Sequence, residues 1–197
     1  MSDIPRLEDL ELRLGGLSGK RIFVRTDFNV PLNYADDGSV SITDDFRIRA
    51  ALPTIGWLTE RGANVVCASH LGRPFAGGRS EPNPKYSMDP VRARLAELAP
   101  GVELLENLRF DAGETGNSDQ FVAQLLAGTN GKAIDGYVND AFGASHRSHA
   151  SIVGPPERVP AAMGRLLEKE VKVLLGLRNK PKHPFVAVLG GAKVSDK

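Results

Sequence analysis

The sequence has a single cysteine, Cys67, and no long apolar stretch. One cysteine cannot form a disulfide within the chain, and its position inside an apolar run predicts a buried structural thiol. The N-terminus lacks a basic region followed by an apolar stretch, and nowhere is there the run of about 18 apolar residues that a membrane-spanning helix needs. We therefore expect a cytoplasmic protein that does not bind a membrane.

A strong net charge is missing as well. The chain has 25 Lys and Arg against 24 Asp and Glu, and the resulting net charge of +1 gives no support to bulk electrostatic binding of nucleic acid. Neither the phosphate-binding loop Gly-x-x-x-x-Gly-Lys-Ser/Thr nor the dinucleotide fingerprint Gly-x-Gly-x-x-Gly occurs. These absences disfavour a P-loop NTPase and a dinucleotide-binding enzyme.

Short apolar runs do occur, and they alternate with segments of helical spacing. The runs are residues 22–24, 65–68, 102–105, 137–138 and 185–189. Apolar residues recurring every three or four positions predict helices from about 46 to 61, 89 to 98, 118 to 126 and Pro160 to Leu177. Strands that alternate with helices are typical of βαβ units. The expected fold is α/β, a three-layer α/β/α sandwich with a mainly parallel, Rossmann-like sheet.

Charged side chains follow each apolar run within a few residues. In an open parallel sheet the ligand binds outside the carboxyl ends of the strands, so these side chains are expected to form one site. They include four arginines, two histidines and two lysines, which together indicate an anionic ligand. These residues are Arg25, Arg73, Arg109, Arg147, His70, His146, Lys193 and Lys197.

Five motifs resemble phosphoglycerate kinase, in the order of that family. They are VRTDFNVP at 24–31, SHLGRP at 69–74, ENLRF at 106–110, NDAFG at 139–143 followed by His146 and Arg147, and GGAKVSDK at 190–197. The resemblance runs from about Lys20 to Lys197 and covers only the family's N-terminal half. It implies reversible phosphoryl transfer from 1,3-bisphosphoglycerate to ADP, giving 3-phosphoglycerate and ATP in glycolysis.

The resemblance also implies a role for each residue that matches a motif. Asp27 and Asn29 would meet the hydroxyl group of 3-phosphoglycerate, with Phe28 between them in the same motif. Arg47 would be catalytic, facing the substrate's carboxyl group and the phosphoryl group in transfer. The substrate's own phosphate would be held by three arginine side chains and one histidine side chain. Two uncharged residues stand between the histidine and the first of these arginines in the same motif and are expected to bind substrate as well. Together these residues are His70, Leu71, Gly72, Arg73, Arg109 and Arg147.

The nucleotide is expected mainly outside this chain. By the same resemblance, Lys193 would be catalytic at the transferred phosphoryl group, and Lys193 and Lys197 would contact the phosphates of ATP or ADP. Residues 1–185 would be the N-terminal, 3-phosphoglycerate-binding lobe, and residues 186–197 would begin the region between the lobes. A C-terminal lobe, absent here, would bind most of the nucleotide with Mg²⁺. No metal-ligand cluster is apparent in the sequence of this lobe.

Several alternatives stay open at this stage. Arg25 and Asp140 fit a solvated position or a structural salt bridge better than a ligand contact, and His146 either orients Arg147 or touches the ligand. His149 and His183 are expected on the surface. The family commonly has a further strand and helix where only residues 99–103 intervene here, so a peripheral βα unit is expected to be missing.

Two functions are compatible with these observations. The first is the substrate-binding half of a phosphoglycerate kinase, which would be inactive by itself and would have its own C-terminal lobe as partner. Because the last motif stops after one turn of an expected helix, we expect the natural polypeptide to continue past Lys197. The second is a stand-alone anion-binding module without transferase activity. In either case we expect a monomer that binds neither nucleic acid nor membrane.

Overall fold

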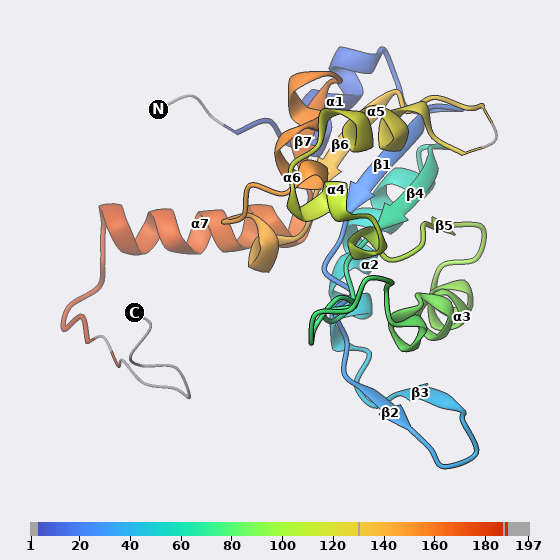
Figure 1. Ribbon diagram of the computed structural model, residues 1–197. Helices are drawn as coiled ribbons and strands as arrows, with labels where there is room; N and C mark the ends of the chain where they lie inside the picture. The colour runs from blue at the N-terminus through green and yellow to red at the C-terminus, as the bar shows by residue number, and fades with distance from the viewer. Residues whose placement is uncertain (1–3, 130, 187, 189–197) are drawn as a thin grey trace.

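A five-stranded parallel sheet forms the centre of the protein in the computed structural model, which describes residues 4–129, 131–186 and 188 (Figure 1). The strands lie in the order β5-β4-β1-β6-β7, and each neighbouring pair is parallel. Their bounds are β1 Arg21–Arg25, β4 Asn64–Ala68, β5 Glu103–Leu104, β6 Gly136–Asn139 and β7 Ala161–Met163.

Helices cover both faces of this sheet, and a small hairpin lies apart from it. The hairpin pairs β2 with β3 in antiparallel register around the turn at 36–38. The remaining elements are α1 Leu7–Leu14, β2 Leu32–Tyr34, β3 Val40–Ile42, α2 Phe46–Thr59, η1 Pro84–Tyr86, α3 Asp89–Leu98, η2 Leu108–Phe110, α4 Ala112–Thr115, α5 Asp119–Ala127, η3 Phe142–Ala144, α6 Ala150–Val153, η4 Pro155–Glu157 and α7 Arg165–Asn179.

The alternation of side chains along β1 shows why the domain has three layers. Ile22 and Val24 point into a core shared with buried residues of α1, α2 and α3, whereas Phe23 points to the opposite face. There it stacks against Tyr137 and packs with Leu125 of α5. Since successive residues of a strand face opposite sides, β1 contributes side chains to the cores on both faces of the sheet. The predicted α/β sandwich is confirmed, and Cys67 is buried in the first core as expected.

Two of the expected elements are wrong. A helix was expected from Pro160, but residues 161–163 form β7, in parallel register with residues 137–139 of β6, and α7 begins only at Arg165. The carbonyl of Pro160 accepts a hydrogen bond from the backbone N–H of Tyr137 at 2.9 Å, which draws this segment into the sheet. The expected strand at 185–189 is not seen in its described residues, Phe185, Val186 and Val188, which are exposed.

Helix α7 extends away from the sheet (Figure 1). Leu167, in its first turn, is buried against the domain, but Val173, Leu174 and Leu177 are exposed, so the apolar stripe expected along this helix is only partly covered. Over the part of the chain that the structure describes, no helix combines the length and the apolar character that crossing a membrane requires.

Candidate anion-binding site

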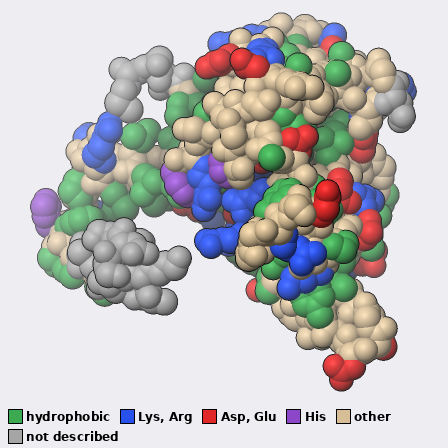
Figure 2. Space-filling model, in the orientation of Figure 1, with side chains coloured by type: hydrophobic (Ala, Val, Ile, Leu, Met, Phe, Trp, Pro, Cys, Tyr) green, Lys and Arg blue, Asp and Glu red, His purple; other side chains and the backbone are tan. Residues whose placement is uncertain are grey.

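Loops after three strands bring the basic side chains together. Arg73, Arg109 and Arg147 follow β4, β5 and β6, and Figure 2 shows Lys, Arg and His side chains gathered near the middle of one face. Burial lowers the pKa of Arg109, and the positive charges of Arg147, Arg25 and Arg73 lower it further. Such repulsion requires the charges to be near one another. The predicted cluster of arginines at one edge of the sheet therefore exists.

Arg109 is held in place by the loops around it. Its backbone N–H donates to Oδ1 of Asn107 at 3.1 Å, and its Nη1 donates to the carbonyl of Gly72 at 2.7 Å. Its Nε is buried and has no hydrogen-bond partner among the described residues. Because an unpaired buried donor is costly, the guanidinium is prepared to receive an acceptor such as a phosphate oxygen.

Gly72 links this arginine to the loop after β1. Its N–H donates to Oδ1 of Asn29 at 2.9 Å while its carbonyl accepts from Arg109. Its φ of +59° lies in the left-handed region, and a Cβ at this position would meet the ring of Tyr86 at 2.4 Å. Only glycine fits here, and its backbone is fully used within the protein. Gly72, which is predicted to bind substrate, therefore joins the loops that carry Asn29 and Arg109 through its backbone.

Asp27 and Arg47 lie together beside these loops. Nη1 of Arg47, in the first turn of α2, donates to Oδ2 of Asp27, after β1, in an ion pair. Asp27 also accepts from the backbone N–H of Asn29, at 3.3 Å. The ion pair lines a cavity of about 250 Å³, which Phe142 and Gly143 border as well. The structure therefore places these two predicted site residues next to each other.

Two residues expected to bind substrate have buried side chains. The side chains of Phe28 and Leu71 are 0% and 2% exposed and pack in the core shared with α1, α2 and α3. The backbone N–H of Phe28 donates to Oγ of Ser69 at 2.8 Å, and both the N–H and the carbonyl of Leu71 are bonded to Asn107. Neither side chain can reach a ligand, so each anchors its loop.

Arg25 has the structural role that the sequence analysis favoured. Its side chain is fully buried and is held by four partners. Nε donates to Oγ of Ser151 at 2.8 Å, Nη1 to the carbonyl of Thr26, and Nη2 to Nδ1 of His70 at 3.2 Å. Nη2 also lies 4.0 Å from Oε1 of Glu114. Asp140, likewise fully buried, accepts from two backbone N–H groups of α7 and is structural too.

The histidines differ in their placement. His70 is buried behind the arginine cluster, and burial together with the charges of Arg25, Arg109 and Arg147 lowers its pKa to about 2. It is therefore neutral. His146 and His183 are exposed, the latter as predicted. The expectation for His149 is wrong, because this residue is buried, with Nδ1 at 3.5 Å from Oε1 of Glu114.

Glu114 and Ser151 are parts of the site that sequence reasoning missed. Both are fully buried, and the Glu114 carboxylate accepts from the Ser151 hydroxyl at 2.7 Å and from its backbone N–H at 3.0 Å. A buried arginine requires a nearby carboxylate, but the chain has 24 acidic residues, and nothing in the sequence around Glu114 marks it as the partner.

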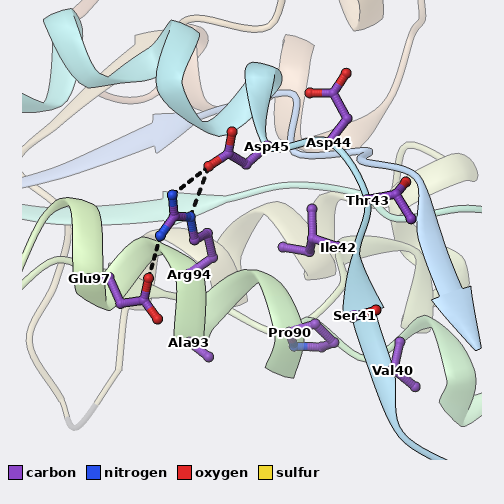
Figure 3. Close-up of a pocket in the computed structure, with 10 residues that line it drawn as sticks. All are labelled: Val40, Ser41, Ile42, Thr43, Asp44, Asp45, Pro90, Ala93, Arg94 and Glu97. Atoms are coloured by element: carbon purple, nitrogen blue, oxygen red, sulfur yellow. Dashed lines mark hydrogen bonds and ion pairs between the residues drawn. The ribbon is translucent and has the colours of Figure 1, made fainter. Parts of the chain in front are cut away.

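A second hollow lies away from the basic cluster. A cavity of about 650 Å³ between the β2–β3 hairpin and α3 is lined by apolar side chains and by Asp44, Asp45, Arg94 and Glu97 (Figure 3). Arg94 donates to Asp45 at 2.8 Å and also to Glu97, so its charge is already compensated. None of the predicted site residues lines this cavity, and its carboxylates disfavour an anion.

Neither a metal-ligand cluster nor the lysines expected at the nucleotide are found among the described residues. Within residues 4–129, 131–186 and 188, no three His, Cys, Asp or Glu side chains are grouped as metal ligands. The two lysines expected at the nucleotide, Lys193 and Lys197, lie outside the described residues.

The comparisons with known proteins agree with this geometry. A family model described as phosphoglycerate kinase matches residues 11–103 and 99–197. The chain belongs to the phosphoglycerate kinase family. The two matched segments meet at 99–103, the connection where the family's further βα unit is expected to be missing.

Relatives of the phosphoglycerate kinase family resemble the chain over nearly its whole length. Phosphoglycerate kinases of Rubrobacter xylanophilus and Kineococcus radiotolerans are 50% and 44% identical to it, each over 97% of this chain and 50% and 52% of their own. The structure of phosphoglycerate kinase from Coxiella burnetii matches with a TM-score of 0.79 at 32% identity, over 98% of this chain and 50% of that one. The chain thus spans about half the length of the curated relatives it matches.

Proposed function

We propose that this chain is the 3-phosphoglycerate-binding half of a phosphoglycerate kinase, the glycolytic transferase that moves a phosphoryl group from 1,3-bisphosphoglycerate to ADP. The observation that carries the proposal is the convergence of Arg73, Arg109 and Arg147 beside the Asp27–Arg47 pair at the carboxyl edge of the sheet. In this proposal residues 1–185 form the substrate lobe, residues 186–197 begin the region between lobes, and the reaction takes place in the cytoplasm.

The described residues suit the requirements of such a reaction. Phosphoryl transfer is catalysed chiefly by positioning the reactants and neutralising their charge. The three arginines of the cluster would hold the phosphate that the substrate keeps. Arg47, half-exposed and paired with Asp27, is free to turn its remaining N–H groups toward the carboxyl group and the phosphoryl group in transfer.

The nucleotide is proposed to bind mainly to a second lobe. Lys193 would steady the transferred phosphoryl group and, with Lys197, would contact the phosphates of ATP or ADP, for which the likeness of residues 190–197 to the family's motif is the support. Mg²⁺ would arrive with the nucleotide, because phosphate oxygens are among its preferred ligands.

A complementation assay tests the proposal. Residues 1–197 alone should show no turnover with 3-phosphoglycerate and MgATP, because closing two lobes is what aligns the phosphates and excludes water. Adding the C-terminal half of the Rubrobacter xylanophilus relative should restore measurable ATP-dependent turnover. Arg47→Ala should remove most of the recovered rate, while Arg49→Ala, whose side chain pairs with Asp45, should not.

Two outcomes would contradict this proposal. Robust turnover by residues 1–197 alone, absent from an Arg47→Ala preparation made in parallel, would show that no second lobe is needed. Binding of 3-phosphoglycerate without any recovered turnover, with several related C-terminal halves, would favour the stand-alone anion-binding module.

A further inference from the structure

A buried chain of polar contacts runs behind the arginine cluster and ends at its histidine. Glu114 accepts a hydrogen bond from the Ser151 hydroxyl at 2.7 Å, and that hydroxyl in turn accepts from Nε of Arg25 at 2.8 Å. Nη2 of Arg25 reaches Nδ1 of His70 at 3.2 Å. These residues come from α4, α6, β1 and the loop after β4, so the chain joins four separate parts of the fold.

The direction of the last hydrogen bond follows from chemistry. A guanidinium has only donors and keeps its charge in proteins, so Nδ1 of His70 must be the acceptor. The proton of the neutral imidazole therefore lies on Nε2. Arg25 itself is 0% exposed, which prevents it from touching a ligand, whereas the His70 side chain keeps 8% of its surface.

The charge on Arg25 needs compensation, and Glu114 supplies it. An unpaired buried charge costs several kcal/mol, and the carboxylate of Glu114 lies 4.0 Å from Nη2 of Arg25. Ser151 connects the two groups, and its own carbonyl accepts from the hydroxyl of Tyr137 at 2.9 Å. These contacts hold the guanidinium of Arg25 in a fixed orientation relative to the imidazole of His70.

We propose that Glu114 is a positioning residue for the anion site: through Ser151 and Arg25 it fixes His70 as a neutral imidazole that presents its Nε2–H to the ligand. This inference rests on the proposed function only in naming 3-phosphoglycerate as the ligand. In this arrangement the neutral His70 side chain donates a hydrogen bond to the ligand, and the arginines alone supply the positive charge of the site.

The groups around His70 agree with a neutral imidazole. Positive charges surround it, from Arg25, Arg109 and Arg147, and His149 is a further basic neighbour, so a second proton on the ring is opposed from several sides. The carboxylate of Glu114 is turned toward Ser151 and lies 3.5 Å from the ring of His149. Acidification should thus leave His70 unchanged over the range in which exposed histidines titrate.

Nuclear magnetic resonance of the ligand-free chain tests the tautomer directly. The chain has four histidines, and long-range ¹H–¹⁵N correlations distinguish their tautomers once the His70 signals are identified by their loss in His70→Gln. We expect the Nε2–H form for His70, with no titration between pH 5 and pH 8. An Nδ1–H form, or an imidazolium at pH 6, would overturn the inference whether or not the chain binds 3-phosphoglycerate.

Variants then test the positioning role by calorimetry with 3-phosphoglycerate. Glu114→Gln should weaken binding about tenfold and should mix the His70 tautomers, because a lost hydrogen bond to a charged group has about this effect. The matched control Glu60→Gln, at an exposed end of α2, should change neither. If Glu114→Gln does not fold, Ser151→Ala replaces it, since this change breaks the link to Arg25 and keeps both charges.

A conservative replacement separates positioning from a purely structural role. In His70→Gln an amide N–H can donate near the place of Nε2–H, so this variant should bind 3-phosphoglycerate within about threefold of the unmodified chain. His70→Ala should bind about tenfold more weakly. Equal losses in both variants, or unchanged binding and tautomer in folded Glu114→Gln or Ser151→Ala, would refute the inference. Failure of the unmodified chain to bind 3-phosphoglycerate would instead count against the proposed function.

Discussion

The carboxylate of Asp140 accepts a hydrogen bond from the backbone N–H of Leu166 at 2.9 Å, which ties the end of β6 to the first turn of α7. The same oxygen accepts from the N–H of Leu167 at 3.2 Å. A Cβ on Gly164 would lie 2.3 Å from this oxygen, so glycine is needed next to it. Asp140 thereby caps the helix that extends away from the domain.

This cap should make the stability of the protein depend on pH. Burial raises the pKa of Asp140 to about 6, although hydrogen bonds from Thr54, Leu167 and Leu166 oppose the rise. The unfolded chain, with a pKa of about 3.9 for this group, loses the proton first as the pH rises. The free energy of unfolding contributed by Asp140 therefore falls between about pH 4 and pH 6.

Asp140→Asn isolates this effect. The amide keeps the shape and one acceptor oxygen but carries no charge, so the variant should gain about 2–3 kcal/mol relative to the unmodified chain between pH 4 and pH 7. Urea unfolding followed by fluorescence of Trp57, the single tryptophan, measures the difference. Asp36→Asn, in an exposed turn, serves as control. If the unfolding free energies of Asp140→Asn and of the unmodified chain change with pH in parallel, the pKa of Asp140 is not raised by burial.

For the two exposed arginines of the cluster we expect a different pattern, in which ligand binding changes and stability does not. Arg73→Ala and Arg147→Ala should each weaken 3-phosphoglycerate binding by about 1.5–3 kcal/mol, the scale of a hydrogen bond to a charged group. Both side chains are exposed, so the melting temperature should hardly move. Arg109→Ala should lose binding and stability together, because its Nη1 supports Gly72. Arg158→Ala, whose side chain pairs with the exposed Asp119, is the control. If calorimetry finds that Arg73→Ala and Arg147→Ala bind 3-phosphoglycerate as tightly as Arg158→Ala, a phosphate site here is excluded.

Gly72 and Gly77 form a matched pair for the backbone of the site. Both have positive φ, +59° and +79°, but a Cβ on Gly77 meets no described atom within 4 Å, whereas one on Gly72 would collide with Tyr86. Gly77→Ala should cost about 1 kcal/mol of unfolding free energy from strain alone. Gly72→Ala should cost about 2–4 kcal/mol because overpacking is added, and it should weaken 3-phosphoglycerate binding. Equal costs in urea unfolding would mean that Tyr86 moves aside freely.

Local patterns were enough to predict most of the sheet. The β1, β4 and β6 strands lie in buried runs whose ends are marked by polar motifs. β7 was missed because Ala161–Met163 consists of good helix formers and becomes a strand only by pairing with β6. The start of α7 was misplaced for the same reason.

The site was predicted less completely than the fold. Motif residues could be expected to meet because loops after neighbouring parallel strands share one edge, but the direction in which each side chain points depends on long-range packing. Phe28 and Leu71 turn into the core, and His149 is enclosed by contacts that its neighbours in sequence do not reveal. Glu114 lies 37 residues from Ser151, so no local spacing could pair them.

Calorimetric titration of residues 1–197 with 3-phosphoglycerate is the decisive experiment for the proposed anion site. We expect saturable binding at one site and loss of most of that affinity in the Arg73→Ala/Arg147→Ala double variant. We also expect much weaker binding of glycerate, which lacks the phosphate that the arginines hold. No saturable binding by a chain that circular dichroism shows to be folded, or equal affinity for 3-phosphoglycerate and glycerate, would contradict the proposed anion site.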